Sequence, residues 1–171
     1  MFQLRLLKGA SIKPAWGYSL DFVPHLSGAA VRWHRSDKSA MLDVIVDPGD
    51  IQPLSCLLGA DRLARDLERV LPDAIERACE TWDRGSSWPG MLDLVRDIFA
   101  QQSNVLNFEN YTQMPLTLGL LFAKVGDWVA ANAELEQYVR QHGLSEEVAA
   151  KFAALARDLA AHTDTTAATP I

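Results

Sequence analysis

The chain has 171 residues, of which 49% are hydrophobic and 22% are charged, and its formal net charge is -6. The length fits one domain, and the apolar content is sufficient to form a core, which argues against a chain that is disordered throughout. The acidic balance argues against nucleic-acid binding, because neutralising phosphates requires a basic surface. It favours a basic protein partner instead.

Membrane insertion and secretion are also disfavoured by the sequence. No apolar run approaches the roughly 20 residues of a membrane helix, and basic residues are scattered through the opening apolar residues, unlike those of a signal peptide. The two cysteines, Cys56 and Cys79, have no metal-ligand neighbours at the spacing of zinc sites and are typical of small buried side chains. We therefore expect a soluble cytoplasmic protein without cofactors or membrane partners, either a monomer or a weak dimer.

The first part of the chain carries the pattern of β-strands. Residues 2–7 form a short helix or an edge strand, with the helix preferred, and Pro14 marks the turn region that follows. Apolar and polar side chains then alternate over residues 18–22, 31–34 and 42–46, with turn-forming residues between the three segments. This succession predicts an antiparallel β-meander of three or four strands.

After Pro53 the apolar residues recur with the period of α-helices until near the C-terminus. The first helical stripe runs from Leu63 to Trp82, and we expect a break or kink near Leu71 because Pro72 cannot donate to the helix ladder. A run of strands followed by a run of helices is typical of an α+β fold, in which sheet and helices form separate layers.

Serine and aspartate residues mark the starts of the later helices. Ser87, Asp127 and Ser145 each precede an apolar-periodic segment, where a side-chain oxygen can accept from free backbone N–H groups. Another helix is expected from about residue 112 to residue 124, and Gly143 is placed to end the helix that follows Asp127.

Residues 118–139 resemble one tetratricopeptide-type helical hairpin, with a glycine-aspartate turn, an aromatic residue after it and small residues where the two helices approach. No second copy follows at a fixed period, so a single hairpin packed on the domain is the better interpretation. We predict one α+β domain over residues 1–162, in which an N-terminal antiparallel sheet packs against C-terminal helices that end in this hairpin and one more helix. Residues 163–171 are predicted to be a disordered tail.

Four polar residues of the strand region are the candidate ligands or acid-base groups, namely Asp21, His25, His34 and Asp43. If the strands brought them together, they would support a metal-dependent or acid-base enzyme. The favoured interpretation is that they lie on the solvent-facing side of an alternating sheet. No catalytic, cofactor-binding or metal-binding residue is therefore assigned.

The candidate partner surface comprises Trp16, Trp33, His34 and Arg35, because tryptophan and arginine are enriched in interface hot spots. Trp16 is expected to be partly exposed beside a glycine. Trp33 is better explained as a core residue under the helices, since tryptophans are buried on average. The hypothesis is a non-catalytic protein that binds a basic partner.

Five short segments spread over most of the chain carry a resemblance to a known family, namely Leu6-Leu7-Lys8, Lys13-Pro14, Gly17-Tyr18, Leu71-Pro72 and Ala123-Lys124-Val125-Gly126-Asp127. In this order they resemble a family of small bacterial proteins classed as domain of unknown function 4304. The resemblance implies a sheet-plus-helices fold and no established catalytic residues. Some small acidic bacterial proteins are toxin-neutralising immunity proteins, and this analogy of size and charge suggests an immunity-like or adaptor role.

Overall fold

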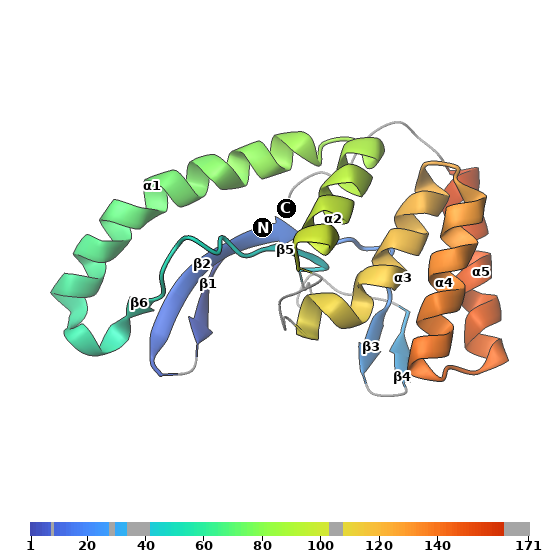
Figure 1. Ribbon diagram of the computed structural model, residues 1–171, viewed down its shortest axis with the longest axis horizontal. Helices are drawn as coiled ribbons and strands as arrows, with labels where there is room; N and C mark the ends of the chain where they lie inside the picture. The colour runs from blue at the N-terminus through green and yellow to red at the C-terminus, as the bar shows by residue number, and fades with distance from the viewer. Residues whose placement is uncertain (8, 28–29, 34–41, 103–107, 163–171) are drawn as a thin grey trace.

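The computed structural model describes residues 1–7, 9–27, 30–33, 42–102 and 108–162, and its architecture is α+β (Figure 1). The N-terminal antiparallel sheet and the C-terminal helices confirm the predicted fold class. In chain order the elements are β1 (Phe2–Leu7), β2 (Ser11–Tyr18), β3 (His25–Ser27), β4 (Ala30–Arg32), β5 (Val44–Val46), β6 (Leu54–Ser55), the 3-10 helix η2 (Cys56–Leu58), α1 (Ala60–Arg84), α2 (Trp88–Gln102), α3 (Phe108–Lys124), α4 (Trp128–His142) and α5 (Glu146–Ala161).

Strand β2 is the centre of the main sheet. It pairs with β1 on one side and with β5 and β6 on the other, all antiparallel. The register places Phe2 opposite Trp16, Trp16 opposite Val46, and Ile12 opposite Leu54. Strands β3 and β4 pair with each other in a separate two-stranded sheet. The sheet is therefore assembled around β2 from segments far apart in the chain.

Two of the predicted strand assignments need correction. The preferred helix over residues 2–7 is wrong, because these residues pair along their whole length with β2. The strand predicted over residues 18–22 is also wrong, because β2 ends at Tyr18. The chain then turns, and the N–H of Val23 donates to the carbonyl of Leu20 at 3.0 Å.

Pro14 lies inside β2, where the sequence suggested a turn. The N–H of Gly17 donates to the carbonyl of Met1 at 3.0 Å, and the amino group of Met1 donates back to Gly17 at 2.7 Å. Along an antiparallel pair of strands, residues alternate between those that bond to the partner strand and those that point away from it. Gly17 bonds toward β1, so Pro14, three residues earlier, has its nitrogen pointing away from β1. On that side β5 pairs with residues 16–18 and β6 with residues 11–12, so proline falls in the gap between them and no ladder bond is lost.

Helix α1 runs without interruption through Pro72, so the predicted break is wrong. Figure 1 shows α1 as one long curved helix that bows over the sheet. The ring of Pro72 lies on an exposed side of the helix, where the curvature accommodates the missing N–H donor. Cys79 of α1 is exposed and Cys56 of η2 is half-buried, so the expectation of two buried thiols is wrong as well.

Helices α2 to α5 form the other layer, and their predicted caps are confirmed. The Oγ of Ser87 accepts from the N–H of Gly90 at 3.2 Å, Asp127 caps α4, and Ser145 caps α5. Gly143 ends α4 in the left-handed conformation that favours glycine. No helix in the described part of the chain is long and apolar enough to cross a membrane.

Two apolar clusters hold these layers together. The smaller one joins the sheet to α1 and is centred on Trp16, Ala74 and Ala78, whereas the larger one fills the space among α2, α3, α4 and α5. Val46 and Trp82 pack against both clusters. The sheet and the helical layer are therefore joined through shared apolar contacts.

Candidate functional site

Asp43 is buried, and its carboxylate accepts a hydrogen bond from the backbone of its own chain. Its Oδ2 accepts from the N–H of Leu20 at 2.6 Å, and its own N–H donates to the carbonyl of Tyr18 at 2.8 Å. The prediction that Asp43 faces solvent is wrong, because β5 begins only at Val44 and the preceding carboxylate turns inward to cap the turn after β2. Asp43 therefore has a structural role.

Among the described candidate acid-base residues, Asp21, His25 and Asp43 do not form a group that could hold a metal ion. His25 is half-buried, with its Nδ1 at 3.2 Å from the Nε2 of Gln113, and Asp21 is exposed. His34 lies outside the described residues. Within the described ranges no group of three or more His, Cys, Asp and Glu side chains is arranged to hold a metal ion. The geometry thus provides no support for the enzyme hypothesis.

Trp16 is a core residue, and the expectation that it is partly exposed is wrong. Only 2% of its surface is exposed, its ring stacks on Phe2 with centroids 6.2 Å apart, and its Nε1 donates to the Oγ1 of Thr81 at 2.9 Å. Trp16 is buried because β2 extends from Ser11 to Tyr18 and places this residue beneath α1. Trp16 is therefore not an anchor for a partner.

Trp33 lies half-buried against α5, at the edge of the larger cluster. Its ring centroid is 5.3 Å from that of Phe152, and the Nζ of Lys151 lies 6.0 Å from the ring centroid. His34 and Arg35, the other members of the candidate partner surface, lie outside the described residues. Of the two members that the structure describes, Trp16 is buried and Trp33 is placed where a partner could reach part of its side chain.

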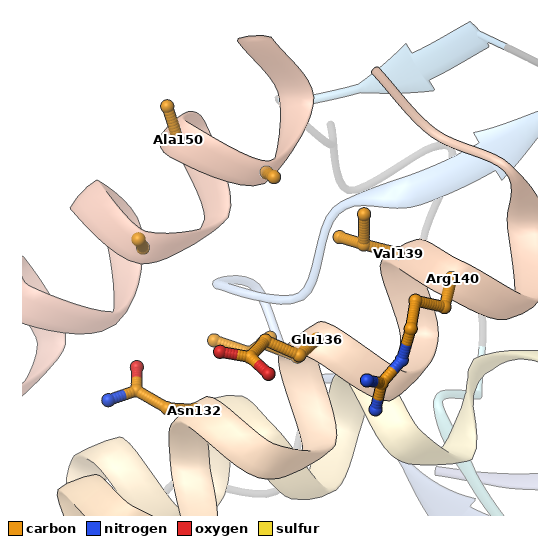
Figure 2. Close-up of a pocket in the computed structure, with 8 residues that line it drawn as sticks. Asn132, Glu136, Val139, Arg140 and Ala150 are labelled. Atoms are coloured by element: carbon orange, nitrogen blue, oxygen red, sulfur yellow. The ribbon is translucent and has the colours of Figure 1, made fainter. Parts of the chain in front are cut away.

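A groove between α4 and α5 is a concave site in the described part of the chain that the sequence did not predict. It has a volume of about 440 Å³. Figure 2 shows Asn132, Glu136 and Arg140 along α4, with Ala150 across from them on α5. The remaining lining residues are apolar, namely Leu135, Val139, Ala149 and Ala153. An apolar floor with a few polar groups on the rim is the usual composition of a binding site.

The groove follows from small side chains on α5. Ala149, Ala150 and Ala153 present only methyl groups toward α4, so the two helices leave an open channel where larger residues would fill the space. Leu135 forms the floor, because its side chain is buried against Gly119 of α3. The short loop from Gly143, which ends α4, to Ser145, which caps α5, turns the chain back and sets the two helices side by side.

The rim of the groove carries opposite charges that are separate from each other. Glu136 and Arg140 are one helical turn apart and both exposed, yet no ion pair joins them among the described residues. Residues 127–162 as a whole contain six carboxylates and three lysine or arginine side chains. One of these cations, Lys151, is held by Glu147 at 2.7 Å. Residues 127–162 therefore carry a net negative charge, and Glu136 is the carboxylate that lines the groove itself.

The alanine-rich pattern of α5 was the available signal for this groove. The tetratricopeptide-type resemblance of residues 118–139 pointed to close approach between α3 and α4, and the structure bears this out at Gly119. The groove lies on the other side of α4, and it depends on how α5 packs, which no local pattern specifies.

No family model matches the chain, and no curated protein or solved structure gives a significant match.

Proposed function

We propose that the protein is a non-catalytic binding protein of adaptor or immunity-like type, which docks an amphipathic helix of a basic partner in the groove between α4 and α5. The observation that carries the proposal is the apolar floor of Leu135 and Val139 beside the carboxylate of Glu136, which has no ion-pair partner among the described residues. An apolar helix face would rest on the floor, and a lysine or arginine at its edge would pair with Glu136.

The chemistry of the groove favours a helix over a small ligand. The methyl groups of Ala149, Ala150 and Ala153 allow a partner backbone to approach closely, as small residues do where helices pack. Anchoring side chains would be desolvated on Leu135 and Val139, which is where interface energy concentrates. The net charge of -6 would steer a basic partner toward this surface and speed the encounter.

Trp33 does not line the groove, although it also packs on α5. Its ring lies against Phe152 and 6.0 Å from the Nζ of Lys151, and neither of these residues is part of the groove lining. The proposed docking site therefore rests on the groove residues alone. The resemblance to a family of unknown function adds no mechanism, and family membership remains a prediction.

Co-purification from the native organism tests the proposal, with neighbouring gene products included and with low and raised salt compared. Glu136→Lys reverses the rim charge, and Ala150→Arg fills the channel with a large cation. Asp158→Lys is the matched control, because it makes the same charge change on an exposed carboxylate of α5 outside the groove. All three side chains are exposed, so folding should be retained.

We expect a stoichiometric basic protein to be retained by the wild type and by Asp158→Lys, and to associate more slowly as salt rises. Both groove variants should weaken its binding by about tenfold or more, through repulsion and lost contact. Equal retention by all four proteins would place the interface elsewhere. Recovery of a monomer alone at both salt concentrations would count against the binding function itself.

A further inference from the structure

The outer edge of β1 is an exposed apolar strand edge. β1 is six residues long and lies at the end of the strand order, with no described residue paired to its outer side. Leu4 is 44% exposed and Leu6 is 76% exposed. Natural sheets usually protect such an edge with proline, lysine or a bulge, because free N–H and C=O groups template association. Figure 1 shows the tip of the β1–β2 hairpin projecting away from helices α2 to α5.

The hydrogen bonds of Met1, the residue just before β1, show which residues of β1 bond to β2 and which face the outer edge. Met1 and Gly17 exchange both backbone hydrogen bonds, so odd-numbered residues of β1 bond to β2. The N–H and C=O groups of Phe2, Leu4 and Leu6 therefore point to the outer edge. These are also the residues whose side chains share one face of the sheet, because side chains alternate with a period of two.

This edge is self-complementary about Leu4. The sequence Phe2-Gln3-Leu4-Arg5-Leu6 has apolar and polar residues placed symmetrically on either side of its centre. In an antiparallel pair of two such strands, Leu4 lies opposite Leu4 of the second copy and Phe2 lies opposite Leu6. Every outward N–H and C=O group in this segment then finds a partner, and Arg5 lies opposite Gln3, so no like charges are directly opposed.

We propose that two copies of this chain associate through antiparallel pairing of their β1 strands, with the two-fold axis at Leu4. Such a contact is isologous, because each copy uses the same patch, and it joins the two sheets into one continuous sheet. The most exposed leucine of the strand, Leu6, is then covered by Phe2 of the second copy. The interface shares no residues with the groove between α4 and α5, so the proposed dimer and the proposed binding function are tested independently.

Sedimentation velocity over a range of protein concentrations tests the dimer. Leu4→Lys places two cations directly opposite each other across the axis, and Leu4→Glu does the same with two anions. An equimolar mixture of the two variants replaces this repulsion by an attractive pair. Leu57→Lys is the control, because Leu57 is 76% exposed on η2, away from the outer edge of β1. Circular dichroism checks that each variant is folded.

We expect the wild type and Leu57→Lys to sediment as dimers, and each Leu4 variant alone to sediment as a monomer at the same concentration. The mixture should regain the dimer, which only pairing of Leu4 with Leu4 explains. A wild type that stays monomeric at the highest concentration would overturn the proposal. So would a dimer that survives both single variants, since that dimer must use another surface.

Discussion

Two buried tyrosines show how the fate of a single hydroxyl depends on its neighbours. The hydroxyl of Tyr18 donates to the carbonyl of Trp82 at 2.8 Å, with the carbonyl of Thr81 at 3.2 Å. The hydroxyl of Tyr138 is buried beside Phe152 and has no hydrogen-bond partner in the described part of the chain. A buried polar group stabilises the fold only when it is paired. The two residues should therefore respond differently to loss of the hydroxyl.

We expect Tyr18→Phe to lower the free energy of unfolding by about 1 kcal/mol, since it removes the hydrogen bond to the carbonyl of Trp82, whereas the carbonyl of Thr81 still accepts from the N–H of Gly85 at 3.0 Å. Tyr138→Phe should leave the free energy unchanged or raise it, because it removes an unpaired group and keeps the ring. Urea denaturation of both variants measures the difference. A larger loss in Tyr138→Phe than in Tyr18→Phe would contradict this account of the core.

Alkaline pH gives a second test of Tyr18. Burial, followed by the charge of Asp83, raises the pKa of Tyr18 from 10.0 to about 12. The neutral phenol is thus favoured by the folded state, and its contribution is fully present below the unfolded pKa and lost as pH rises from 10 to 12. The free energy of unfolding should fall over this range, and less steeply in Tyr18→Phe. Equal slopes for the two proteins would refute the assignment to Tyr18.

At the scale of elements, the pairing of β2 with β5 requires a glycine at position 17. A Cβ on Gly17 would lie 1.8 Å from the carbonyl oxygen of Val44, which is backbone and cannot move aside as a flexible side chain could. We expect Gly17→Ala to destabilise the fold by about 3 kcal/mol, at the upper end of overpacking effects. Thermal denaturation measures it. Gly49→Ala is the control, because nothing lies within 4 Å of its added methyl group. Similar melting temperatures for the two variants would show that β5 can shift.

The helix starts could be predicted from the sequence because capping is local chemistry. Ser87, Asp127 and Ser145 each accept from a backbone N–H three residues later, so the residues that decide the start lie within one turn. Helix α3 begins at Phe108, earlier than predicted, where the polar sequence before residue 112 gave no such signal.

The strands were harder to predict because their partners are distant. β2 was missed because Pro14 was interpreted as a turn residue, and only its position between β5 and β6 makes it compatible with a strand. Asp43 was placed on the solvent side by alternation, yet its carboxylate accepts from Leu20, 23 residues away. Both errors arise where a contact between distant segments overrides a local pattern.

At the scale of the whole molecule, the sheet and the helical layer contribute different surfaces. The sheet ends in the exposed edge of β1, and the helical layer carries the groove between α4 and α5 (Figure 2). The groove could not be predicted from the sequence, because it depends on the packing of α5 against α4. The prediction of one domain over residues 1–162 is compatible with Val46 and Trp82, which contact both apolar clusters.

The central claim is that a basic partner binds in the groove, and methyl NMR tests it most directly. The groove is lined by methyl groups of Leu135, Val139, Ala149, Ala150 and Ala153, and the exposed methyl groups of Leu57 and Leu58 on η2 are a control on another element. On titration with the co-purified partner, we predict that the largest shift changes occur at the five groove residues and that the η2 methyl groups stay unchanged. Shift changes centred on Leu4 and Leu6, or on the η2 leucines, with an unchanged groove would contradict the claim.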